Sequence, residues 1–238
     1  MTSIEALVNR QLMRLAVKQQ SVSPPKRPAE GPPRQLRVIT ISRQTGSGGR
    51  AIARSLAETL GLEFVDRQIL DYIAQNTGPR DKLLDSLDER TRSGIDLWVE
   101  GILRGRYIDR PEYARLLVQS MTAMAEHGDA VILGRAGNVI LGPRGGLHVR
   151  IVAPREVRVA NLVEYKGMTP EQADHTVRTS DDERSTFYRK HFGADIDDSA
   201  DYHMVINTGR VTLDRAHEII NAAWEFLIGW PEPAKARG

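Results

Sequence analysis

The feature that most constrains the fold is a glycine-rich loop between a β-branched run and an amphipathic pattern. The segment "VITISRQTGSGG" (38–49) opens with the run, and residues 50–60 repeat apolar side chains three and four positions apart until Gly61. A strand, a glycine loop and a helix in this order make a phosphate cradle, because free main-chain N–H groups and a helix N-terminus attract anions. The usual pattern, GxxxxGK[ST], has a lysine where this chain has Gly49, followed by Arg50.

Short apolar runs alternate with helical patterns along most of the chain. This alternation predicts an α/β fold, in which crossover helices cover both faces of a parallel sheet. The predicted strands are residues 37–42, 63–65, 130–134, 147–153 and 203–207. The predicted helices are residues 50–60, 67–76, 111–127, 154–165, 170–191 and 212–228.

Two stretches interrupt this alternation, and both are candidate lids. Residues 78–110 are charged and weakly periodic, and residues 154–193 are helix-rich and carry several arginines. In an open α/β sheet, ligands bind at the carboxyl ends of the strands, where such insertions can fold over them.

The N-terminal region predicts a short helix on a semi-rigid tether. Residues 4–18 place apolar side chains on one helical side, whereas residues 21–35 contain five prolines and cannot continue a helix. The helix is a plausible contact for a homodimer, and docking onto its own chain is the open alternative. We expect residues 1–36 to form this basic region, residues 37–230 the folded domain, and residues 231–238 a flexible tail.

Composition narrows the function classes. The 238 residues include no cysteine, which excludes disulfides, thiolate catalysis and cysteine-ligated metal. No apolar stretch approaches the ~20 residues needed to cross a bilayer, and the N-terminus lacks a secretory pattern, so we expect a cytoplasmic protein. Residues 1–37 carry a net charge of +5 within an overall +2, which leaves −3 for the remainder. A basic tail of this kind could touch nucleic acid or an acidic lipid surface, but a solvated flexible tail is the favoured explanation and a nucleic-acid partner is not expected.

Three segments carry a resemblance to a known family. "VITISRQTGSGGRAIARSLAETLGLEFVDRQIL", "AVILGRAGNVIL" and "RTSDDERSTFYRKHFG" resemble, in this order, the cytidylate-kinase-like family, a variant branch of the P-loop nucleoside monophosphate kinases. The likeness spans roughly residues 37–228. It implies a P-loop NTPase fold with a five-stranded parallel sheet, an acceptor-binding insertion at about 67–127 and a lid at about 154–193. It also implies ATP with Mg²⁺ as donor and a pyrimidine nucleoside monophosphate as acceptor.

The resemblance assigns the donor phosphates to the loop. The expected ATP phosphate-binding residues are Thr45, Gly46, Ser47, Gly48, Gly49 and Arg50. Lysine normally neutralises the β- and γ-phosphates, and a Ser/Thr hydroxyl holds magnesium. Here these two positions are Gly49 and Ala51, so Arg50 is expected to supply the charge. The metal ligands stay open between the phosphates, water and a hydroxyl such as that of Thr45.

The resemblance also assigns the acceptor, the lid and the catalytic cations. The expected acceptor-binding residues are Asp66, Arg135, Asn138, Asp181 and Arg184; the lid residues are Arg155 and Arg158; the catalytic residues are Arg50, Arg135 and Arg184. Several arginines suit phosphoryl transfer, which depends on positioning and charge neutralisation. Asp66 has an alternative role as the cap of the helix that follows it.

These features predict an ATP-dependent phosphotransferase, a nucleoside monophosphate kinase acting on a CMP or dCMP type of acceptor. The alternative is a nucleotide-binding regulatory or interaction protein with weak or no kinase activity. Four positions motivate that alternative, because each lacks a side chain that the reaction or base recognition would use: Gly49, Ala51, Arg67 and Ala136.

Overall fold

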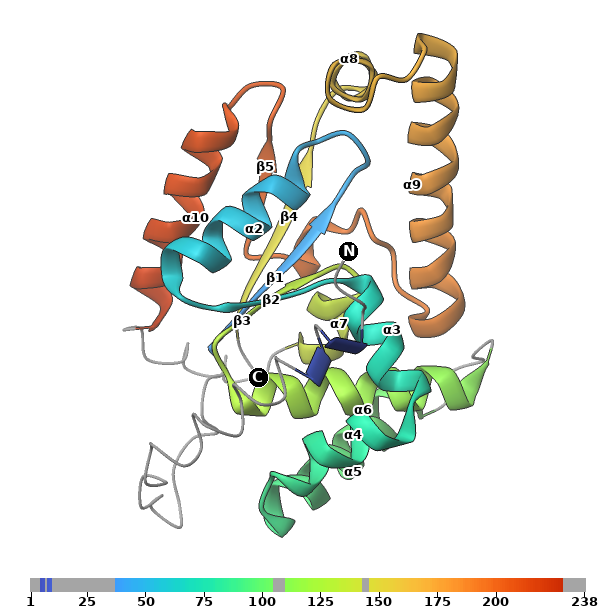
Figure 1. The fold of residues 1–238 in the computed structure, drawn as a ribbon, viewed down its shortest axis with the longest axis vertical. Helices are drawn as coiled ribbons and strands as arrows, with labels where there is room; N and C mark the ends of the chain where they lie inside the picture. The colour runs from blue at the N-terminus through green and yellow to red at the C-terminus, as the bar shows by residue number, and fades with distance from the viewer. Residues whose placement is uncertain (1–4, 7, 10–36, 105–109, 143–145, 229–238) are drawn as a thin grey trace, which may run out of the picture.

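The computed structural model describes residues 5–6, 8–9, 37–104, 110–142 and 146–228. Its centre is a five-stranded parallel sheet in the order β2-β3-β1-β4-β5 (Figure 1). The strands are β1 (Val38–Arg43), β2 (Glu63–Val65), β3 (Ala130–Leu133), β4 (Leu147–Val152) and β5 (Met204–Asn207). The predicted α/β fold with a five-stranded parallel sheet is confirmed.

Two helices cover one face of the sheet. These are α2 (Gly49–Leu60), which follows the glycine loop, and α10 (Leu213–Ile228), near the end of the described chain. Ile39 and Ile41 of β1 point toward this face and pack with Ile52 and Leu56 of α2. Gly61 ends α2 in the left-handed conformation that glycine adopts at helix C-termini. The packing anchors α2, whose N-terminus faces the carboxyl edge of the sheet.

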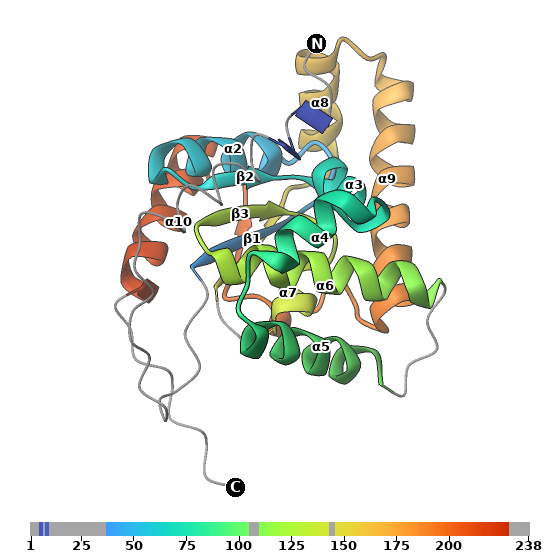
Figure 2. The same ribbon diagram turned by 60° about the horizontal axis from the view of Figure 1, so that its bottom comes forward.

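The other face carries a larger group of helices (Figure 2). Here α3 (Arg67–Gln75), α6 (Pro111–His127) and the short α7 (Gly137–Leu141) pack against the sheet or against each other. Two further helices, α4 (Thr77–Asp85) and α5 (Glu89–Leu103), pack against α6. The charged stretch 78–110 therefore forms two helices that end at residue 103, and its buried Leu83, Ile95 and Val99 join the core.

The second insertion is a helical hairpin formed by α8 (Arg155–Lys166) and α9 (Pro170–Phe192). It has a small core of its own, made by Leu162, Ala173 and Val177. Thr169 begins α9 with a capping box, since its side chain accepts from the Gln172 N–H while the Gln172 side chain accepts from the Thr169 N–H. A 3₁₀ turn at Ser199–Asp201 then leads to β5.

The predicted N-terminal helix, the tether and the C-terminal tail fall mostly outside the described residues. Residues 5, 6, 8 and 9 are helical, and Val8 is buried in the core cluster that includes residues of α3 and α6. In the described ranges, every helix is too short or too polar to span a bilayer.

Candidate active site

The glycine loop joins the carboxyl end of β1 to the N-terminus of α2. Gly46 and Gly48 have φ angles of +82° and +78°, a region that residues with a Cβ rarely adopt. The Ser47 hydroxyl is buried and donates to the Gln44 carbonyl at 2.8 Å, which closes the turn. Four main-chain N–H groups have no hydrogen-bond partner among the described residues, and they can bind an anion: those of Gly46, Gly48, Gly49 and Arg50.

The helical hairpin closes over this loop through the predicted DxxR pair. Asp181 accepts from the Thr45 N–H at 2.8 Å, from Arg158 at 2.5 Å and from Arg184 at 2.9 Å. Arg184 also donates to the Thr45 hydroxyl. On α8, the Asn161 amide donates to the Gly46 carbonyl at 2.8 Å. The structure therefore brings the loop together with Asp181, Arg184 and Arg158.

The other predicted lid arginine has a different position. Arg155 pairs with Asp174, so it ties α8 to α9. About half of its side chain is exposed, and its hydrogen bond and ion pair to Asp174 lie within the hairpin. Of the two lid arginines, only Arg158 contacts the loop.

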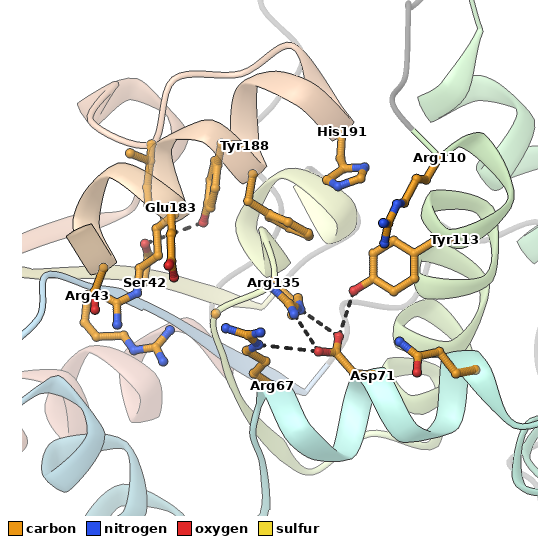
Figure 3. Close-up of a pocket in the computed structure, with 16 residues that line it drawn as sticks. Ser42, Arg43, Arg67, Asp71, Arg110, Tyr113, Arg135, Glu183, Tyr188 and His191 are labelled. Atoms are coloured by element: carbon orange, nitrogen blue, oxygen red, sulfur yellow. Dashed lines mark hydrogen bonds and ion pairs between the residues drawn. The ribbon is translucent and has the colours of Figure 1, made fainter. Parts of the chain in front are cut away.

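A cavity of about 450 Å³ lies beside the loop, at the carboxyl ends of β1 and β3 (Figure 3). Its other walls are α3, the start of α6 and one face of α9. The lining includes two carboxylates, Asp71 and Glu183, and a larger number of cations: Arg43, Arg67, Arg110, Arg135 and Arg184. This excess of positive charge favours an anionic ligand.

Arg135 is held firmly in this cavity. It donates two hydrogen bonds to Asp71, at 2.7 Å from Nε and 2.5 Å from Nη2, and Tyr113 donates a third to the same carboxylate at 2.7 Å. The guanidinium also lies 4.6 Å from the centre of the Phe187 ring. Burial alone would raise the pKa of Asp71, but the Arg135 and Tyr113 hydrogen bonds outweigh it and hold the pKa below its usual value.

Arg135 is the middle one of three consecutive residues in the left-handed backbone conformation. Gly134, Arg135 and Ala136 have φ angles of +86°, +52° and +54°. For the two residues with a Cβ, this conformation costs about 1–2 kcal/mol each. Strained backbone of this kind persists where the surrounding structure imposes it, often at a binding site. Here the turn between β3 and α7 carries Arg135 into the cavity.

Arg50 and Asp66 meet in an ion pair of 2.6 Å. Asp66 is buried and also caps α3, accepting from the N–H groups of Gln68 at 3.0 Å and Ile69 at 3.3 Å. The Arg50 side chain is 55% exposed, so its guanidinium lies at the outer edge of the loop. The capping role considered for Asp66 is thus present in the structure.

Asn138 lies deeper than the other predicted residues. Its side-chain oxygen accepts from the Tyr188 hydroxyl at 2.8 Å, and its amide nitrogen has no hydrogen-bond partner in the described part of the chain. It lines a second cavity of about 290 Å³, next to His148 and His203. It does not line the arginine cavity.

Several residues of the cavity escaped the sequence analysis. Arg43, Asp71 and Tyr113 come from three different elements, and no short motif joins them. The α9 wall did leave a signal, because its lining residues recur at helical spacing: Ser180, Arg184, Phe187 and His191.

Comparisons with known proteins identify the family. The sequence model of the cytidylate kinase-like family matches residues 38–210. The chain belongs to the cytidylate kinase-like family. The cytidylate kinase of Methanopyrus kandleri is 28% identical over 206 residues, which cover 82% of this chain and 97% of that protein. The cytidylate kinase of Natronomonas pharaonis is 25% identical over 187 residues, covering 78% and 88%.

A solved structure supports the fold as well. An uncharacterized protein from Eubacterium ventriosum has a TM-score of 0.62 and 22% identity, covering 81% of this chain and 99% of that one. The sheet order and the loop after β1 are those of a P-loop kinase fold.

Proposed function

We propose that this family member is an ATP-dependent phosphotransferase that converts a nucleoside monophosphate of the CMP or dCMP type to the diphosphate. One observation carries the proposal: an arginine-lined cavity opens directly beside the phosphate loop, at the same edge of the sheet. A donor on the loop and an acceptor in the cavity would then face each other. The cavity volume of about 450 Å³ falls within the range usual for small-molecule sites.

The donor half rests on main-chain groups. The free N–H groups at Gly46, Gly48, Gly49 and Arg50 bind ATP phosphate oxygens, and α2 adds the positive end of its dipole. Asp181 accepts a hydrogen bond from the Thr45 N–H and neutralises part of the charge of Arg158 and Arg184. We expect phosphate binding to displace this carboxylate and to free both guanidinium groups for the donor.

The fit of a magnesium ion depends on the ligands beside the phosphates. Position 51 is alanine, and the described residues contain no group of three or more His, Asp or Glu side chains arranged to hold a metal. The residues present fit a Mg²⁺ ion that is carried by phosphate oxygens and water, which is how this ion usually binds. On the loop, the Thr45 hydroxyl, which accepts from Arg184, would be a candidate protein ligand. The ion would neutralise phosphate charge.

The acceptor half rests on side chains. Arg135 and Arg67 both face Asp71 from the cavity wall, and they offer a monophosphate two guanidinium groups. Phe187 and Tyr113 line the same space and offer ring faces or edges to a base. The choice of a cytosine base rests on the names of the relatives.

The reaction itself needs no covalent intermediate. An oxygen of the acceptor phosphate forms a bond to the γ-phosphorus of ATP, and the bond from that phosphorus to the β,γ-bridging oxygen breaks. ATP and the monophosphate become ADP and the diphosphate. The acceptor is already anionic at neutral pH, so the side chains of this chain orient the two reactants, neutralise charge and exclude water.

A substrate panel tests the proposal. The protein is incubated with ATP, Mg²⁺ and each common ribo- and deoxyribonucleoside monophosphate, and the products are separated by anion-exchange chromatography. We expect diphosphate and ADP in equal amounts, with CMP or dCMP as preferred acceptor. Tight ATP binding without any diphosphate would contradict the proposal and favour a nucleotide-binding regulatory role.

A further inference from the structure

Arg43, the last residue of β1, fills the space beneath the start of α2. Along β1 its side chain alternates in phase with Ile39 and Ile41, so it points to the face that α2 covers. A Cβ atom built on Gly49 would lie 2.6 Å from the Cβ of Arg43 and 3.2 Å from its Cγ. The stem of Arg43 therefore occupies the volume in which a side chain at position 49 would begin.

The other end of the same side chain lies against β3. A Cβ atom at Gly134 would collide with Nη1 of Arg43. Arg43 thus runs between two glycines, one at the phosphate loop and one at the end of β3. Its guanidinium lines the cavity where the donor and acceptor halves meet (Figure 3).

In the described part of the chain, Arg43 has no carboxylate in direct contact, and Asp66, which favours its charge from a distance, is paired with Arg50. Among the described residues Arg43 makes no ion pair and no side-chain hydrogen bond, whereas Arg50 pairs with Asp66 and Arg135 with Asp71. Burial, and then the nearby Arg184, lower the pKa of Arg43 to about 9. A largely buried cation without a partner is costly unless an anion binds to it.

The sequence of the loop is consistent with this exchange of space between positions 43 and 49. In GxxxxGK[ST], a glycine opens the loop and a lysine opens the helix. This chain has Arg43 at the position of the first glycine and Gly49 at the position of the lysine. Because the two side chains would compete for one space, a cation at either position requires a small residue at the other.

We propose that Arg43 supplies, from the end of β1, the positive charge on the transferring phosphoryl group that a lysine at position 49 would otherwise supply. The inference rests on the proposed function, since it needs a donor triphosphate on the loop. It changes the assignment made from sequence, in which Arg50 had this role. Arg50 is held by Asp66 at the outer edge, while Arg43 lies between the loop and the cavity.

Side-chain replacements give the first test. Arg43→Gln keeps a polar side chain with the same first three carbons but shortens it and removes the charge. It should lower kcat about 10²–10³-fold and weaken binding of a nonhydrolysable ATP analogue about tenfold. Arg43→Lys should recover about tenfold of the lost kcat. Arg37→Ala is the matched control, because Arg37 lies just before the opposite end of the same strand and pairs with Asp129. An Arg43→Gln effect confined to the KM of the monophosphate would overturn the proposal.

The exchange of the two positions gives a sharper test. Gly49→Lys alone should lose activity, because its stem collides with that of Arg43. The double variant Arg43→Gly/Gly49→Lys should exceed Arg43→Gly about tenfold in kcat and in analogue affinity. A folded double variant that is no better than Arg43→Gly would overturn the proposal. If thermal melting shows that the double variant does not fold, the Arg43→Gln and Arg43→Lys pair decides.

Failure of the proposed kinase function can be distinguished from failure of the role proposed for Arg43. If the wild type forms no diphosphate from any monophosphate, that function fails, yet analogue affinity still tests Arg43. A tenfold loss in Arg43→Gln with little change in the control Arg37→Ala supports Arg43 as the phosphate cation. Equal affinity of wild type and Arg43→Gln overturns it.

Discussion

The donor and acceptor halves of the site are built from different parts of the polypeptide. The phosphate loop uses main-chain N–H groups from one continuous segment, and two glycines with positive φ give it its shape. The cavity uses side chains from β1, α3, α6 and α9, joined by the Asp71 carboxylate. Substitutions should therefore act on the two halves in separable ways, one on the donor and one on the acceptor.

The largest effect is expected where the two halves meet. Arg184→Ala removes a guanidinium that contacts the loop and also lines the cavity. We expect kcat to fall about 10³-fold, because one arginine on the transferring phosphoryl group commonly contributes that much. Steady-state kinetics measure this. Arg189→Ala, an exposed residue one turn and a half along α9, is the control and should keep kcat. Similar kinetics for both variants would contradict the shared role of Arg184.

The next variant isolates the acceptor half. Arg135→Ala should raise the KM for the monophosphate about 100-fold, because it removes a guanidinium proposed to bind the acceptor phosphate in the cavity. The affinity for an ATP analogue should stay within about twofold. Initial rates at varied acceptor concentration measure it. Arg115→Ala, on the exposed side of α6, serves as the control. Weakened ATP binding in Arg135→Ala would show that the halves are not separable.

The lid offers a matched pair on one helix. Arg158→Ala should reduce kcat/KM for ATP about tenfold, because Arg158 bonds to Asp181 and lies over the loop. Arg155→Ala breaks only an exposed pair with Asp174, worth about 0–1 kcal/mol, and should change kcat/KM less than twofold. Titration of ATP at fixed acceptor compares the two. Equal losses of kcat/KM in the two variants would contradict the specific role of Arg158 over the loop.

The smallest effect concerns stability. Gly134→Ala should lower the free energy of unfolding by about 1–2 kcal/mol, because φ is +86° there and the new Cβ meets Arg43. Gly94→Ala, inside α5 with open space around it, should instead add about 0.5–1 kcal/mol. Urea denaturation measures both. A neutral Gly134→Ala would show that the turn before Arg135 relaxes easily.

The strength of the local apolar pattern explains which strands and helices the sequence could predict. All five strands and six of the helices were visible, because their apolar patterns are strong and the glycine loop marks the first crossover. The helices α4 and α5 were missed, since residues 77–103 are largely polar and bury few side chains. The short α7 was missed because its five residues are too few to show a helical repeat.

The candidate site divides in the same way. Thr45 and Gly46 could be placed on the loop from local spacing alone, and Asp181 and Arg184 from a resemblance and an i,i+3 spacing. Asp71 could not be found, since its partners Tyr113 and Arg135 lie 42 and 64 residues away in sequence. Arg43 received no role from the sequence, because only the packing against Gly49 shows its significance.

A crystal structure with both substrates present tests the account most directly. Crystals grown with a nonhydrolysable ATP analogue and CMP should show the tripolyphosphate on the N–H groups of Gly46–Arg50. The CMP phosphate should lie beside Arg135, with Arg43 in contact with the γ-phosphate. Nucleotide bound away from the loop, or CMP outside the arginine cavity, would contradict the account.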